Sequence, residues 1–171
     1  MAKGLILHYK LDEILYNNLI NKELDCSGYK QDGIINGIIE KTINSSRYRT
    51  SCYFDSSSFI EMPHIYDINT LIKNFSVSCW IKKNYSDNNE RHFYYGIVDL
   101  YIYTDGKLRI SWKHTSDDLN YNTRNTWATG ITIPNNEWTY IVFTFNNGII
   151  NVYINGQYIK TSNRSNNATN I

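Results

Sequence analysis

The chain is poor in residues that interrupt or crosslink a fold, with 2 Pro, 2 Met and 3 Cys among 171 residues. Three cysteines are an odd number, and none stands in a CxxC motif or near a His at metal-ligand spacing, so we interpret them as free thiols. Alanine is rare, which disfavours long helices. The 42% of hydrophobic residues includes many that favour strands, and 15% of the chain is aromatic. The composition therefore favours an all-β protein.

The chain also lacks a charge surplus and a long apolar run. Lys and Arg number 17 against 16 for Asp and Glu, so neither nucleic acid nor an anionic membrane is an expected partner. His8 and Lys10 interrupt the N-terminal apolar run, which predicts a first strand rather than a signal peptide or a membrane span. A protein without a signal can still act outside a cell when it is assembled into a particle, as phage structural proteins are.

The length predicts one domain, residues 1–171, large enough to bury a core without crosslinks. Short strand candidates alternate with turn residues, which is typical of a sandwich or barrel. These candidates span 4–11, 33–40, 47–55, 58–63, 75–83, 96–104, 107–113, 137–146 and 148–156. One helical turn is expected at 67–74, with Asp67 as its N-cap.

Two hairpins stand out, because Asp-Gly joins 96–104 to 107–113 and Asn-Gly joins 137–146 to 148–156. In a strand, alternate side chains share a face. The apolar phases predict a core of Phe75, Val77, Cys79, Ile81, Val98, Leu100, Ile102, Leu108, Ile110, Ile141, Phe143, Phe145, Ile150, Val152 and Ile154. The opposite phases hold Trp80, Tyr101, Tyr103, Arg109, Tyr140 and Tyr153, which is unusually aromatic for a solvated face.

Five motifs in order resemble the concanavalin A-like lectin/glucanase superfamily, in particular its laminin-G-like jelly-roll domains of bacterial and phage type. They are Tyr9, Leu11 and Asp12; Asp25, Ser27 and Gly28; Phe54 and Asp55 before Phe59 and Ile60; the strand from Phe75 to Lys82; and Trp138, Thr139 and Ile141 with Tyr153, Ile154, Asn155 and Gly156. The resemblance implies a two-sheet antiparallel jelly-roll sandwich.

The resemblance also raises a question about the C-terminus. Domains of this family add a final pair of strands beside the first strand, whereas this chain ends in the polar stretch 163–171. Two explanations stay open: the chain is a fragment that lacks its last strands, or a neighbouring chain covers the edge.

Catalysis is not expected. Glucanases of this fold carry an E-x-D-x-x-E strand that places acid and nucleophile together, and the sequence has no such run. The four histidines stand alone, and no phosphate-binding loop, dinucleotide fingerprint or GxSxG motif is present. No cofactor is therefore expected, although the family allows calcium, for which Asp25, Asp32 and Asp55 are the candidate ligands; alternatively, Asp25 caps its own turn.

What remains is binding through aromatic and amide side chains, which suit sugars. Trp127 is placed in a polar loop with Tyr121 and Arg124. In a loop, the alternation of strand side chains does not assign an aromatic residue to a buried face, so it is free to contact a ligand. With these three residues, the predicted ligand-binding residues are Tyr101, Tyr103, Arg109 and Tyr140. The remaining tryptophans, Trp80, Trp112 and Trp138, could equally fill the sandwich.

Three functions follow as hypotheses. The first is a non-catalytic module of a phage tail or virion appendage that binds a cell-surface glycan or receptor. The second is a structural or decoration protein that packs against other virion subunits, so that it is part of a larger assembly. The third is the lectin-like half of a clostridial-type toxin binding region, against which the short N-terminal lead-in argues. The expected location is a virion or the extracellular space after assembly.

Overall fold

The computed structural model describes residues 5–11, 21–42, 50–55, 57–62, 74–84, 91–94, 98–112, 125–146 and 149–163. Within these ranges the protein is built of strands and turns, without a helix and hence without one that could span a membrane. The chain divides into two compact units, Met1–Ile65 and Tyr66–Ile171. The prediction of a single domain stays a prediction. The expected helical turn at 67–74 lies outside the described residues, apart from Asn74, which begins a strand.

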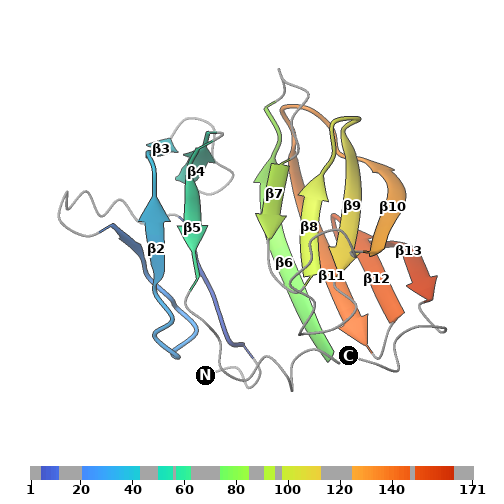
Figure 1. Ribbon diagram of the computed structural model, residues 1–171, viewed down its shortest axis with the longest axis horizontal. Helices are drawn as coiled ribbons and strands as arrows, with labels where there is room; N and C mark the ends of the chain where they lie inside the picture. The colour runs from blue at the N-terminus through green and yellow to red at the C-terminus, as the bar shows by residue number, and fades with distance from the viewer. Residues whose placement is uncertain are drawn as a thin grey trace. The chain divides into compact units, whose positions relative to one another are not determined.

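The second unit is a sandwich of two four-stranded antiparallel sheets (Figure 1). One sheet has the order β13-β12-β11-β6, from Gln157–Asn163, Ile149–Ile154, Trp138–Asn146 and Asn74–Lys82. The other has the order β10-β9-β8-β7, from Asn125–Thr132, Lys107–Trp112, Val98–Ile102 and Arg91–Tyr94. The predicted all-β, two-sheet antiparallel architecture is confirmed.

The predicted hairpins are confirmed. β8 pairs with β9 around the Asp105-Gly106 turn, and β11 pairs with β12. β12 continues into β13 through Asn155 and Gly156, whose φ angles of 50° and 82° are the pair of positive values that a tight two-residue hairpin turn needs. Asn155 also fastens this turn to β11, because its Oδ1 accepts a 2.9 Å hydrogen bond from the backbone N–H of Tyr140.

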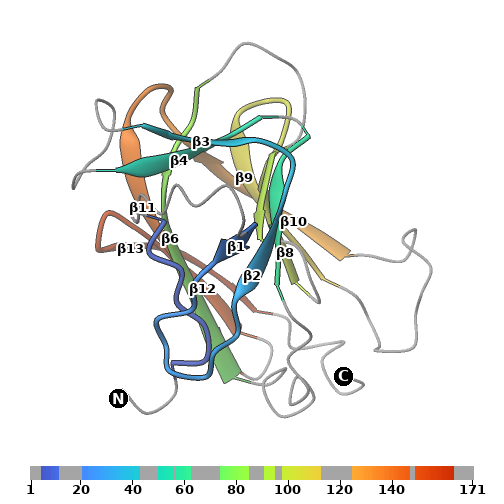
Figure 2. The ribbon, with the colours of Figure 1, turned by 90° about the vertical axis from the view of Figure 1, so that its left-hand side faces the viewer.

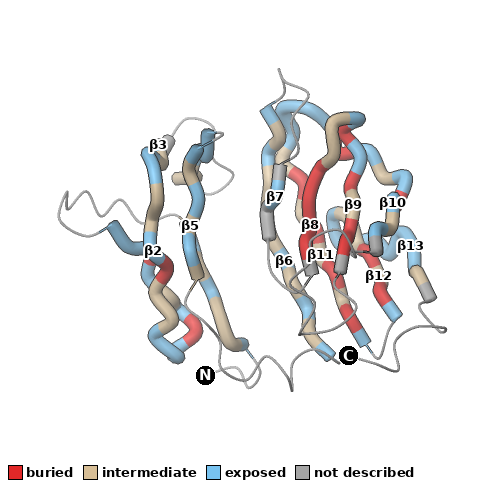
Figure 3. The backbone as a smooth tube through the Cα atoms, viewed as in Figure 1, coloured by how far each residue is buried: buried red, intermediate tan, exposed pale blue. Residues whose placement is uncertain are grey.

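The core lies between the two sheets, and Figure 3 shows the buried positions on β8, β9, β11 and β12. Its buried members are Leu100, Ile102, Leu108, Ile110, Ile133, Ile141, Phe143, Phe145, Ile150 and Val152. The partly buried Phe75, Val77, Cys79, Ile81, Trp127, Ile131 and Ile154 pack against them. Strand parity identified the core residues of β6, β8, β9, β11 and β12, but it missed those of β10 and the segment after it, namely Trp127, Ile131 and Ile133. The side chain of Val98 lies outside the described residues. Each fully buried aliphatic side chain contributes about 1.5–3 kcal/mol.

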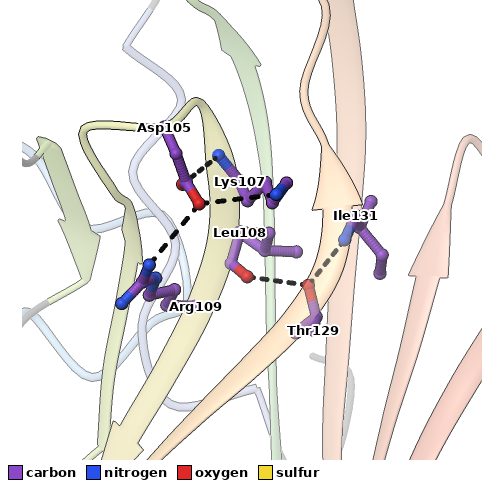
Figure 4. Close-up of polar contacts among 6 residues, drawn as sticks. All are labelled: Asp105, Lys107, Leu108, Arg109, Thr129 and Ile131. Carbon is purple, nitrogen blue, oxygen red and sulfur yellow. Dashed lines mark hydrogen bonds and ion pairs between the residues drawn. The ribbon is translucent and has the colours of Figure 1, made fainter.

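Strand β10, like β1 and β7, was not predicted from the sequence. Its register on β9 shifts between Ala128 and Thr132, where Gly130 has a φ of 76°. The buried Thr129 holds this irregularity together (Figure 4): its Oγ1 donates to the carbonyl oxygen of Leu108 at 2.7 Å and accepts from the N–H of Ile131 at 3.1 Å. A threonine inside the sandwich therefore satisfies the backbone groups that the shifted ladder leaves unpaired.

The first unit contains two small sheets. A three-stranded sheet has the order β1-β2-β5, from Lys22–Glu23, Gly33–Asn36 and Phe59–Glu61, and a two-stranded ribbon pairs β3 with β4, from Ile39–Thr42 and Ser51–Phe54 (Figure 2).

Two strand predictions in this unit were wrong. The strand expected at 33–40 is broken at Gly37, whose φ of 79° bends the chain between β2 and β3. The strand expected at 4–11 is reduced, in its described part, to an isolated bridge between Tyr9 and Asp25. Side chains replace part of the missing ladder there, since the Asp25 carboxylate accepts a hydrogen bond from the N–H of His8.

Candidate binding site

The face of the β7–β10 sheet that points away from the core carries an aromatic and cationic cluster, which we call the tyrosine face: His92, Tyr101, Tyr103 and Arg109. Register brings three of them into one row across the sheet, because Tyr101 pairs with His92 on one side and with Arg109 on the other. Next in the row, on β10, is the exposed Ala128. Across the sheet, the side chains of this row therefore become smaller, from the rings of His92 and Tyr101 to the methyl group of Ala128.

The rings contact one another. His92 stacks on Tyr101 with centroids 4.9 Å apart, and Tyr103 meets Tyr101 edge to face at 6.5 Å. Tyr101 retains only 7% of its accessible surface, whereas His92 is exposed and Tyr103 is half-buried. Tyr101 is therefore the buried base of the cluster, and His92 and Tyr103 provide its solvent-accessible ring surface.

Arg109 completes the cluster from β9. Its guanidinium carbon lies 3.5 Å from the centroid of the Tyr103 ring, a cation–π contact. Its Nη2 reaches the carboxylate of Asp105 at 3.5 Å, a long ion pair (Figure 4). Its Nε is buried without a hydrogen-bond partner in the part of the chain that the structure describes. The guanidinium is thus held in position while its hydrogen-bonding capacity is only partly used.

The hairpin turn fixes Tyr103 and Asp105. The N–H of Tyr103 donates to the carbonyl of Lys107 at 2.9 Å, and the N–H of Gly106 donates back to the carbonyl of Tyr103 at 2.8 Å. Burial alone would raise the pKa of Asp105, but the hydrogen bond from the Lys107 N–H and the charges of Arg109 and Lys107 lower it. Asp105 is accordingly a charged turn residue that orients Arg109.

The structure brings together three of the predicted binding residues and separates the others. Tyr101, Tyr103 and Arg109 form one cluster, whereas Tyr140 lies on the other sheet beside Trp80, with ring centroids 4.9 Å apart. Tyr121 and Arg124 lie outside the described residues.

The loop assignment of Trp127 was wrong. Trp127 lies in β10 opposite Ile110 and packs, partly buried, against the core. The sequence signal for this was available, because Trp127, Thr129, Ile131 and Ile133 alternate with polar or small residues.

Sequence reasoning missed His92, which it treated as an isolated histidine. Only the register of β7 on β8 places this ring on Tyr101. No spacing along the chain carries that information, since the two residues belong to different strands.

The candidate calcium ligands Asp25, Asp32 and Asp55 accept hydrogen bonds from the protein itself. Among the described residues, no group of three or more His, Cys, Asp or Glu side chains could hold a metal. The Asp25 carboxylate instead accepts four hydrogen bonds, from the N–H groups of His8, Ser27 and Gln31 and from the Ser27 hydroxyl.

Both remaining aspartates have protein donors as well. Asp32 Oδ1 accepts from the N–H of Asp25 at 3.1 Å, and Asp55 Oδ1 accepts from Ser57 and Ser58. The alternative in which Asp25 caps its own turn is therefore the one the structure supports.

Among the described residues, Asp99 and Asp105 are carboxylates beside the tyrosine face, and this pair is not arranged for glycoside hydrolysis. Asp99 is 2% exposed and accepts a hydrogen bond from Ser111, while Asp105 sits in the turn beyond the end of β8. The four residue steps from Asp99 to Tyr103 alone span about 13 Å in extended chain. Acid and nucleophile or base carboxylates lie roughly 5–10 Å apart in glycosidases, so this pair does not meet the requirement.

Comparison with known families agrees with this architecture. Residues 54–170 match the model of the concanavalin A-like lectin/glucanases superfamily. That is more than half of the chain, so the protein belongs to this superfamily, as its motifs implied. The sequence comparison with curated proteins gave no match.

Solved structures share the fold at low identity. Domain 4 of AbnA, an extracellular arabinanase from Geobacillus stearothermophilus solved with arabinotriose, is similar with a TM-score of 0.60 and 19% identity over 96% of this chain and 77% of that one. The botulinum neurotoxin serotype D binding domain is similar with a TM-score of 0.60 and 20% identity over 94% of this chain.

A further similar structure is the binding domain of botulinum neurotoxin DC in complex with rat synaptotagmin II, with a TM-score of 0.61 and 20% identity over 89% of this chain. This chain spans 39% and 40% of the two toxin domains. At such identities the likeness concerns the fold.

Proposed function

We propose that this protein is a non-catalytic carbohydrate- or receptor-binding module, and that the tyrosine face is its ligand site. The observation that carries the proposal is the contact of Arg109 with Tyr103 beside the exposed His92 ring. Aromatic rings bind the apolar faces of sugars, and a fixed guanidinium donates to their oxygens. The neighbouring Ala128 in this row is exposed.

The fold neighbours support the same class of function. One was solved with arabinotriose and another with a protein receptor, synaptotagmin II. The carboxylate geometry beside the cluster supports a site that binds and does not hydrolyse. The sequence-based alternative of a toxin binding half gains support from the toxin-like folds, but this concerns architecture alone.

The setting that we propose is a phage tail or another virion appendage, so that the module acts outside a cell after assembly. Its cell-surface target is then a glycan or receptor. The competing function is a structural or decoration protein whose sandwich packs against other virion subunits.

A glycan array with the whole chain tests the proposal, followed by calorimetry with the best-retained glycan. We expect Tyr103→Ala and Arg109→Gln to weaken binding by about tenfold or more, since each removes part of the cluster. Tyr29→Ala is the matched control, because Tyr29 is 59% exposed and lies in the other unit. If no glycan or cell-surface fraction is retained while the chain associates with itself or with virion subunits, the decoration function replaces this proposal.

A further inference from the structure

The opposite sheet of the sandwich carries a second organised surface. The side chains of β6, β11, β12 and β13 that point away from the core form cross-strand rungs, and we call this surface the ladder face. In order along the sheet, its rungs are Lys82–Trp138, Trp80–Tyr140, Ser78–Val142–Tyr153–Tyr158, Ser76–Thr144–Asn151–Thr161 and Asn74–Asn146–Ile149.

One half of the ladder face is aromatic. Trp80 and Tyr140 contact each other across two strands with centroids 4.9 Å apart, and Tyr153 meets Tyr158 at 5.7 Å. Cross-strand aromatic pairs also stabilise sheets. However, Tyr158 keeps 56% of its surface exposed and the other three rings are only half-buried. The Tyr158 ring in particular thus presents its surface to a ligand.

The other half consists of amides and hydroxyls around a hollow. An open depression of about 480 Å³ is lined by Asn74, Ser76, Thr144, Asn146 and Asn151, together with Phe75 and Phe145. Asn151 Nδ2 donates to Thr144 Oγ1 at 3.2 Å, which orients the amide. Asn74, Ser76 and Asn146 are exposed. Such groups both donate and accept hydrogen bonds, as sugar hydroxyls require.

The low charge of the ladder face and its length along the strands indicate which kind of ligand fits it. Of the residues described on this face, only Lys82 is charged, and it stands on the rung farthest from the depression. From Trp80 to Asn74 along β6 the face extends about 20 Å. A surface that combines rings with amides and hydroxyls, and that has nearly no charge, matches a neutral, extended, hydroxyl-rich ligand.

We propose that the ladder face is a second carbohydrate site, which holds a neutral oligosaccharide chain along the strands, its apolar faces against the rings and its hydroxyls in the depression. This site goes beyond the tyrosine face, which has an arginine at its centre. Two sites on opposite sheets would let one module engage two glycan segments and gain avidity.

The test uses the whole chain and neutral hexasaccharides of glucose, mannose, xylose and arabinose, with calorimetry for affinity and stoichiometry. We expect at least one of them to bind, and Tyr158→Ala and Asn146→Ala each to weaken that binding about fivefold or more. Both side chains are exposed, so circular dichroism should show intact folding. Gln157→Ala is the matched control, as an exposed residue of β13 outside the rungs.

Tyr103→Ala separates the two proposals. If it leaves hexasaccharide binding unchanged while Tyr158→Ala weakens it, the ladder face binds whatever the fate of the tyrosine face. The inference is overturned if none of the four hexasaccharides binds, or if binding survives both ladder-face variants within twofold. It is also overturned if Tyr158→Ala abolishes self-association of the chain and no sugar binding is seen, because the ladder face is then a protein interface.

Discussion

The guanidinium of Arg109 lies against the ring of Tyr103, 3.5 Å from guanidinium carbon to ring centroid, although five residues that include a tight turn separate them in the chain. Asp105 in that turn reaches the same guanidinium from the side. Three side chains of one hairpin thus restrain one another before any ligand binds. A ligand that meets pre-positioned groups has less side-chain entropy to remove.

This contact should be measurable as a coupling energy. Cation–π pairs at partly exposed positions contribute about 0.5–1 kcal/mol. We expect a double-mutant cycle of Tyr103→Leu and Arg109→Met to give a coupling of that size in the free energy of unfolding, measured by urea denaturation. A cycle of Tyr29→Leu with Arg109→Met is the control and should give none. A coupling near zero for the first pair would mean that the contact does not restrain either side chain.

The sandwich core should be sensitive to truncation at its centre. Leu108 and Ile141 are fully buried on facing sheets. We expect Leu108→Ala to lower the free energy of unfolding by about 2–5 kcal/mol, because it removes buried methyl groups and leaves a cavity. Ile149→Ala, at a position that is 43% exposed, should change it by less than about 1 kcal/mol. Denaturation curves of the two variants decide this, and equal losses would contradict the core assignment.

Strand alternation predicted this core because it depends only on neighbours within one strand. Leu100 and Ile102 on β8, or Ile150 and Val152 on β12, reveal their buried face through spacing by two. β10 was missed although Trp127, Ile131 and Ile133 share one phase, because the polar Thr129 interrupts that phase. The hydroxyl of the buried threonine donates to a carbonyl of β9. A hydrogen bond between strands is invisible to a reading of either strand alone.

The candidate site was predictable to the extent that it follows parity. Tyr101, Tyr103 and Arg109 were grouped correctly because a two-strand hairpin fixes its own register. Tyr140 was placed with them because it shares the outward phase, although phase alone does not say which sheet a strand joins. His92 was missed for the converse reason, since its neighbour belongs to another strand.

Gly33 should not tolerate a side chain. A Cβ at this position would overlap the Ile60 Cγ2 methyl and the Tyr9 hydroxyl. We expect Gly33→Ala to destabilise the first unit by about 1–3 kcal/mol, as overpacking does. Faster hydrogen exchange at the Ile35 amide, which donates to the carbonyl of Asn21, would report it. Ile34→Ala, at the exposed neighbouring position, should leave that exchange rate nearly unchanged.

The Asp25 turn should persist in acid. Burial alone would raise the pKa of Asp25, but hydrogen bonds from Ser27, Gln31 and His8 lower it from 3.8 to about 2. Because the folded pKa lies below the unfolded one, the carboxylate stabilises the first unit above about pH 3.8, and this contribution is lost as the pH falls through about 2. The carboxyl carbon shift of Asp25 in an NMR titration should give the folded value directly.

A variant tests the same linkage. Asp25→Asn should lower stability at neutral pH and flatten its dependence on pH between about 4 and 2, whereas Ile34→Ala, at an exposed position of β2 without a titratable group, should keep the wild-type slope in that window. An unchanged slope for Asp25→Asn would show that other carboxylates control the acid transition.

The cysteines offer a probe of the same sandwich. Cys26 is exposed, whereas Cys79 packs against the core and burial raises its pKa to about 12. The thiolate is the reactive form, and a buried thiol at neutral pH supplies almost none. We expect iodoacetamide to modify Cys26 in native buffer and to reach Cys79 only in step with unfolding, as mass spectrometry across a urea series would show. Equal native rates at the two thiols would mean that the sheet edge at β6 opens without global unfolding, which would contradict the close packing of Cys79 against the core.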